Sequence, residues 1–152
     1  MSLNVGDTAP DFTLKDSEGE EVTLSSFRGT SVTLVFIPFA FTDRCQGELC
    51  EIRDNLESFV SADNQVLVVT TDAKPSLKEW KAQQGYSFPL LSDHWPHGAV
   101  ASAYDAFNDA VGCANRRTVV IDPNGVVADV FESGGLGESR SLASYTDALA
   151  KL

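Results

Sequence analysis

The stretch Ser31-Val-Thr-Leu-Val-Phe-Ile37 is a nearly continuous run of apolar and β-branched residues. Such a run predicts a strand that is covered on both faces, and this one ends at Pro38. From Cys45 onward, apolar residues recur at the spacing of one helix face, at Leu49, Ile52, Leu56 and Phe59 or Val60. A second buried strand is expected at residues 65–71. The order strand, helix, strand indicates an α/β architecture.

Two hairpin signals and three further helical segments surround this centre. Residues 11–14 and 22–24 flank one turn-forming sequence, and residues 118–121 and 126–131 flank another, Asp122-Pro123-Asn124-Gly125. Helices are expected at residues 75–84, 99–107 and 142–152. We therefore predict a thioredoxin-like α/β fold with an added N-terminal β-hairpin and a central mixed sheet flanked by helices, all in a single domain of residues 1–152.

Composition argues against two classes of partner. The 22 acidic and 11 basic residues give a net charge of −11, whereas a nucleic-acid surface needs a stripe of Lys and Arg. The longest apolar run, residues 32–41, is too short to span a bilayer.

The first seven residues lack the basic start and apolar stretch of a secretory signal, so we expect a cytoplasmic location. In that reducing compartment the three cysteines indicate chemistry or packing instead of structural disulfides.

The junction between the first buried strand and the following helix carries the candidate chemistry. Cys45 lies in the first turn of the expected helix, where unpaired backbone N–H groups favour a thiolate over a thiol. Thr42, three residues earlier, can offer a hydroxyl to the sulfur and to a bound peroxide, and Pro38 can shield the pocket from water. The alternative is that Cys45 is a small packed core residue.

The pattern Pro-x-x-x-Thr-x-x-Cys, formed by Pro38, Thr42 and Cys45, resembles the active-site signature of the peroxiredoxin (AhpC/TSA) family. The resemblance extends over the whole chain, and three segments are similar to the alkyl hydroperoxide reductase E subgroup: residues 45–49, 92–98 and 114–116. It implies a thiol-dependent peroxidase that reduces hydrogen peroxide and organic hydroperoxides through a cysteine sulfenic acid. The resemblance implies no cofactor and no metal.

The same resemblance implies two further site residues. Arg116 matches the family arginine that stabilises the thiolate and the oxyanion formed as the O–O bond breaks. Arg117 stands where relatives commonly carry glycine, and strand alternation implies that only one of the two arginines points inward. Glu48 matches the family acid that holds the arginine by ion pairing; the alternative is a solvated helix carboxylate.

Cys50 matches the resolving position of the bacterioferritin-comigratory, or Q-type, peroxiredoxins, which condenses with the sulfenic acid. An intact helix holds Cα atoms five residues apart at about 8.6 Å, beyond the roughly 7 Å that a disulfide can span. A Cys45–Cys50 disulfide therefore requires the first helical turn to unwind. The alternative is that Cys50 is a packed helix residue. Cys113 receives no firm role: it could act as a resolving thiol after a movement, but we interpret it as a buried or idle thiol.

The expected partners are a hydroperoxide, a reductant of the thioredoxin, glutaredoxin or mycoredoxin type, and a second copy of the chain in a homodimer. His94 and His97 form a pair without further ligands at metal-binding spacing, so we interpret them as loop residues. The competing function is a redox sensor or holdase that uses Cys45 without significant turnover.

Overall fold

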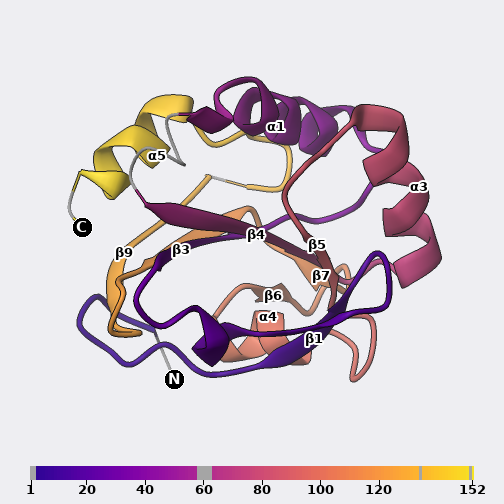
Figure 1. Cartoon of the computed structure of the whole chain (residues 1–152). Helices are drawn as coiled ribbons and strands as arrows, with labels where there is room; N and C mark the ends of the chain where they lie inside the picture. The colour runs from indigo at the N-terminus through magenta and orange to yellow at the C-terminus, as the bar shows by residue number, and fades with distance from the viewer. Residues whose placement is uncertain (1–2, 58–62, 134, 151) are drawn as a thin grey trace.

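The computed structural model describes residues 3–57, 63–133, 135–150 and 152, and its centre is a seven-stranded mixed sheet (Figure 1). The strand order is β2-β1-β5-β4-β3-β8-β9. The strands are β1 (Thr13–Asp16), β2 (Glu21–Thr23), β3 (Ser31–Phe36), β4 (Asn64–Thr70), β5 (Leu90–Ser92), β8 (Arg117–Ile121) and β9 (Val127–Glu132). A separate two-stranded sheet pairs β6 (Phe107–Asn108) with β7 (Cys113–Ala114).

Helices cover both faces of the large sheet. On one face lie α1 (Asp43–Asp54), α3 (Lys74–Gln84) and α5 (Leu142–Leu149), and on the other lies α4 (Ala99–Ala103); a 3₁₀ turn, η1 (Leu24–Phe27), follows β2 (Figure 1). Each face has its own apolar core, one that includes Leu49, Leu77 and Tyr145, the other Val100 and Ala101. The expected thioredoxin-like α/β arrangement is thus present.

The pairing pattern brings distant segments to one edge of the sheet. Strands β3, β4 and β5 are parallel, so their carboxyl ends meet at the same edge. Strand β8 runs antiparallel to β3, with Val35 opposite Thr118. The start of β8 therefore lies beside the end of β3, where the Pro38–Cys45 signature begins.

Most of the predicted elements are present, with shifts at their ends. Both hairpins are confirmed, as β1–β2 and β8–β9. The prediction of a helix at residues 99–107 is wrong at its C-terminal end. Helix α4 ends at Ala103, because Asp105 adopts a positive φ of 57° and Phe107 begins β6. The helix after Cys45 ends at Asp54, and the expected positions Phe59 and Val60 lie outside the described residues.

Two features were not predicted. Strand β5 has three residues, too few to show a period, and it pairs with both β4 and β1. The β6–β7 hairpin has two residues in each strand. Among the described residues, no helix is long and apolar enough to cross a membrane.

Candidate active site

The loop between β3 and α1 is held at the carboxyl edge of the sheet by Asp72. This carboxylate, which follows β4, accepts a hydrogen bond from the Ala40 N–H at 2.7 Å. Asp72 is itself fixed, because Thr70 Oγ1 donates to its carboxylate and the backbone N–H of Asp72 donates to Thr70 Oγ1 at 3.1 Å. Pro38 is buried at the start of the loop. Sequence reasoning missed Asp72, although an acidic residue directly after a buried strand was a usable signal.

Thr42 is the N-cap residue of α1, with φ −84° and ψ 145°. Its side-chain hydroxyl donates to the Phe39 carbonyl at 3.0 Å and does not cap the helix. The first backbone N–H groups of α1 therefore have no side-chain acceptor from Thr42. An anion near this helix start is stabilised by those N–H groups and by the helix dipole.

Cys45 is the third residue of α1 and is 0% exposed. It packs in the same apolar core as Ile37 and Leu49, between the helix and the sheet. The Cys45 sulfur is thus covered by its neighbours in this structure. The exposed Thr42 marks the outer side of this loop.

Glu48, one turn along α1 from Cys45, lies buried between two arginines. Its Oε1 accepts a hydrogen bond from Arg116 Nη1 at 2.5 Å, and both partners are almost fully buried. Arg116 also donates through Nε to the Leu136 carbonyl at 2.7 Å. Arg117 instead forms its ion pair with Glu132 on β9, at 2.7 Å, and Glu132 is more exposed than Glu48. Of the two neighbouring arginines, Arg116 is therefore the one that faces α1.

The second arginine on Glu48 is Arg140, which sequence reasoning missed. Its backbone N–H, Nε and Nη2 all donate to the Glu48 carboxylate, at 2.7, 3.0 and 3.1 Å. Its Nη1 donates to the Arg117 carbonyl at 2.8 Å and to Thr118 Oγ1 at 3.2 Å. Arg140 lies 92 residues from Glu48 in the chain, and nothing in its local sequence distinguished it from a surface arginine.

These contacts explain the ionisation of the cluster. Burial raises the pKa of Glu48, but the hydrogen bonds and charge of Arg140, together with the charge of Arg116, outweigh it and hold the pKa below its ordinary value. Burial lowers the pKa of Arg140, but Tyr145, Glu48 and Cys45 more than offset this effect and raise it. Glu48 is therefore a carboxylate and Arg140 is a cation.

The charges of Glu48, Arg116 and Arg140 do not balance one another. Arg116, Arg140 and Glu48 are each 4% exposed, and their charges sum to +1. Among the described residues the other fully buried carboxylate is Asp93, which accepts from the Val100 and Ala101 N–H groups at the start of α4. The cluster therefore carries a net positive charge, and Glu48 attaches it to the helix that holds Cys45.

The family model for the AhpC/TSA family matches residues 5–130. This chain is a peroxiredoxin. Alkyl hydroperoxide reductase E of Mycobacterium tuberculosis is 50% identical over 151 residues, covering 99% of this chain and 98% of that protein. Chloroplastic peroxiredoxin Q of Oryza sativa subsp. japonica is 36% identical over 132 residues, covering 86% of this chain and 60% of that protein. The solved structure of peroxidoxin BcpB from Mycobacterium tuberculosis superimposes with a TM-score of 0.84 at 30% identity, covering 98% of this chain and 96% of that one.

These relatives establish the activity of this peroxiredoxin as that of a thiol-dependent peroxidase. They do not favour the sensor or holdase alternative. Membership of the family implies a hydroperoxide as the oxidising substrate and a thiol as the reductant.

The other two cysteines of the peroxiredoxin have different surroundings. Cys50 is half-buried, and its sulfur lies 3.7 Å from both Gln84 Oε1 and the Tyr86 hydroxyl. Five residues of helix rotate it about 140° from Cys45, so the two thiols face different sides of α1. Cys113 is buried in β7, where burial, the Cys45 charge and Asp72 raise the pKa of its thiol, opposed by Arg116.

Two exposed aromatic side chains lie within the Pro38–Cys45 signature of this peroxiredoxin. Phe39 is 38% exposed and Phe41 is 46% exposed, and Phe41 holds a positive φ of 65°. The Phe41 ring lies 6.0 Å from the buried ring of Trp80, whose indole N–H donates to Gln46 Oε1 at 3.0 Å. Trp80 thus links α3 to the first turn of α1.

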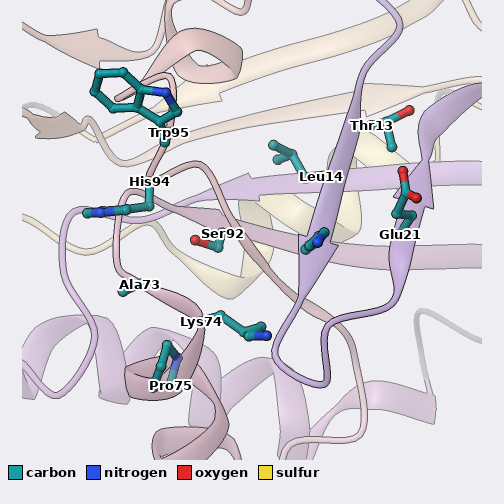
Figure 2. A pocket seen from close by; sticks show the side chains of 10 residues that line it. Thr13, Leu14, Glu21, Ala73, Lys74, Pro75, Ser92, His94 and Trp95 are labelled. Carbon is teal, nitrogen blue, oxygen red and sulfur yellow. The ribbon is translucent and has the colours of Figure 1, made fainter.

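A hollow of about 490 Å³ lies elsewhere on the sheet, between the N-terminal hairpin and the start of α3 (Figure 2). Figure 2 shows Lys74 reaching from α3 toward the hairpin, with His94 and Trp95 on the opposite side. None of the candidate catalytic residues lines this hollow. His94 and His97 contact backbone carbonyls, and the described part of the chain contains no group of three or more residues that could hold a metal ion.

Proposed function

We propose that Cys45 is the peroxidatic cysteine. Its thiolate attacks the terminal oxygen of the hydroperoxide, so that an S–O bond forms while the O–O bond breaks. The alkoxide or hydroxide leaves with the electron pair, takes a proton from solvent, and departs as alcohol or water. Cys45 remains as a sulfenic acid.

The other site residues support this step. Arg116 stabilises the thiolate and then the negative charge that develops on the leaving oxygen. Glu48 fixes Arg116 through their ion pair. Thr42 contacts the peroxide oxygens, and Pro38 shields the pocket from water. The observation that carries the proposal is the +1 charge of the buried Glu48–Arg116–Arg140 cluster beside Cys45.

We also propose a two-cysteine cycle. The Cys50 thiolate attacks the Cys45 sulfur, so that an S–S bond forms, the S–O bond breaks, and hydroxide leaves and is protonated to water. An external thiol of the thioredoxin, glutaredoxin or mycoredoxin type then reduces the disulfide. If Cys50 is only a packed helix residue, the same reductant attacks the sulfenic acid directly.

Stopped-flow kinetics with hydrogen peroxide and an organic hydroperoxide test the first proposal. Cys45→Ser should abolish turnover, whereas Cys113→Ser, the matched removal of another buried thiol, should retain it. Peroxide consumption that survives Cys45→Ser would refute the assignment of Cys45.

Mass spectrometry tests the second proposal. One equivalent of peroxide should convert the protein to a form that is two mass units lighter and contains a Cys45–Cys50 linked peptide. A persistent sulfenic acid at Cys45, with Cys50 still free, would remove Cys50 from the cycle.

We further propose that the chain forms a single domain, acts as a homodimer and works in the cytoplasm. Exposed Phe39 and Phe41 support a subunit contact next to the active-site loop, because aromatic side chains are enriched at interfaces. Sedimentation analysis should give a dimer for the wild type and a weaker one for Phe41→Ser. Unchanged dimerisation in the variant would place the contact elsewhere, and a wild-type monomer would refute the homodimer.

A further inference from the structure

The hollow between the N-terminal hairpin and the start of α3, here called the hairpin hollow, is separate from the Cys45 site (Figure 2). Its volume of about 490 Å³ is in the range that holds small organic molecules. Strands β1, β2 and β5, the start of α3 and the loop after β5 supply its walls. Because no candidate catalytic residue lines it, a ligand in the hairpin hollow does not contact the peroxidase site.

Two lysine side chains from different elements line the hairpin hollow. Lys15 comes from β1, and Lys74 is the first residue of α3. Neither forms an ion pair with a described residue, whereas Lys78 further along α3 pairs with Glu18 at 3.7 Å. Lys74 extends toward the hairpin (Figure 2), and a Cβ placed on Gly19 would lie 3.3 Å from its Nζ. Two ammonium groups without a carboxylate partner among the described residues thus meet at one hollow, in a protein whose net charge is −11.

The start of α3 adds positive potential to the same place. Its N-cap residue is Ala73, which has no side-chain acceptor for the first N–H groups of the helix. The partial positive charge of a helix start stabilises an anion nearby. The helix start therefore adds to the attraction that Lys15 and Lys74 exert on an anion.

Trp95 supplies an aromatic surface on the side of the hairpin hollow opposite the hairpin (Figure 2). Its side chain is 82% exposed, more than any other large apolar side chain of the described residues. An indole ring exposed to this extent removes apolar surface from water when a planar ring stacks on it. The hairpin hollow thus offers a cationic part and an aromatic part to one ligand.

One carboxylate, that of Glu21 on β2, also lines the hairpin hollow. Glu21 lies opposite Lys15 in the pairing of β1 with β2, but the two side chains form no ion pair. Two ammonium groups against one carboxylate leave the hollow positively charged. Glu21 therefore weakens the attraction for an anion without reversing it.

We propose that the hairpin hollow binds a small aromatic anion, with the anionic group between Lys15 and Lys74 and the ring against Trp95. Lysine ammonium groups attract phosphates and carboxylates alike, so the chemistry of the site defines an aromatic ligand that carries one of these two groups. This ligand site is independent of the chemistry at Cys45.

Nuclear magnetic resonance of the ¹⁵N-labelled, full-length reduced protein tests the proposal, with phenyl phosphate and benzoate as probes. We expect saturable shifts at the amides of Lys15, Lys74 and Ser92, with a Kd on the order of 1 mM or lower for at least one probe. The probe that binds more tightly identifies the anionic group. Phenol, which lacks the charge, and inorganic phosphate, which lacks the ring, should each bind at least about tenfold more weakly.

The same titrations can overturn the proposal. The site does not exist if neither probe gives saturable shifts in the hairpin hollow up to about 10 mM, or if the shifts are centred elsewhere on the protein. Equal binding of phenol would show that the lysines do not select the ligand. Equal binding of inorganic phosphate would show that the ring contributes nothing.

Substitutions separate the hairpin hollow from general electrostatic attraction. Lys15→Gln and Lys74→Gln should each weaken binding of the preferred probe by about 3–10-fold, whereas Lys81→Gln, in the last turn of α3 and outside the hollow, should leave it unchanged. Glu21→Gln should strengthen binding by about 2–3-fold, because it removes a repulsive charge. Trp95→Ala should weaken binding of the probe but not of inorganic phosphate. An equal loss in Lys81→Gln and Lys74→Gln, or weaker binding in Glu21→Gln, would refute the site.

Discussion

Replacing Glu48 with Gln should strongly destabilise the reduced protein. Glu48 accepts four hydrogen bonds from two buried guanidinium groups. A glutamine offers one acceptor oxygen and turns an NH₂ donor toward the arginine N–H groups. Removing one partner of a buried ion pair costs about 3–5 kcal/mol, because it leaves buried charge uncompensated. At roughly 2–4 °C per kcal/mol for a chain of this size, the Tm should fall by about 6–20 °C.

The loss should depend on pH in a defined direction. The pKa of Glu48 is lower in the folded protein than its ordinary value of 4.5, since Arg140 and Arg116 outweigh the effect of burial. The stability that the ionised carboxylate contributes is therefore complete above the ordinary pKa and is lost as pH falls through the lowered folded pKa. The difference between wild type and Glu48→Gln should accordingly be largest near neutral pH and shrink in acid.

Urea unfolding of the reduced proteins at several pH values measures this difference. Glu51→Gln serves as the matched control, because its carboxylate is exposed on the same helix and its loss should change the unfolding free energy by no more than about 0.5 kcal/mol. A loss below about 1 kcal/mol at neutral pH for Glu48→Gln, or a difference that grows as the pH falls, would refute the buried-cluster reasoning.

Three further results are expected. Arg116→Lys should slow the reaction with peroxide by about 100-fold in stopped-flow assays, whereas Arg117→Lys should change it little, because Arg117 pairs with Glu132 outside the cluster; equal effects would contradict the assignment. Gly98→Ala should lower stability by about 2–3 kcal/mol in urea unfolding, because its Cβ would lie 2.3 Å from the Phe107 ring at a φ of +70°. Gly137→Ala, which meets nothing within 4 Å, is the control, and a similar cost for both would be inconsistent with that clash. Cys113 should react with iodoacetamide far more slowly in the folded protein than in urea at pH 8, since burial raises the pKa of its thiol; equal rates would show that it is accessible.

The central strands and the two hairpins could be predicted because their signals are local. Residues 31–37 and 65–71 are apolar runs that correspond to β3 and β4, and Asp122-Pro123-Asn124-Gly125 is a turn that places β8 against β9. Strand β5 gave no such signal, because three residues cannot show a period and its pairing with β1 depends on a segment far away in the chain.

By itself, the sequence determined the strand–loop–helix junction with Pro38, Thr42 and Cys45, because short-range spacing places a cysteine in a helix's first turn. The resemblance of the sequence to the peroxiredoxin family also predicted Arg116 and Glu48 as site residues. Only the tertiary structure decided that Arg116, and not Arg117, faces α1, and that Arg140 joins Glu48 from 92 residues away. The physical reason is that an arginine in a sequence is most often a surface charge. The packing of β8 and of the segment before α5 onto α1 instead buries Arg116 and Arg140 around the Glu48 carboxylate.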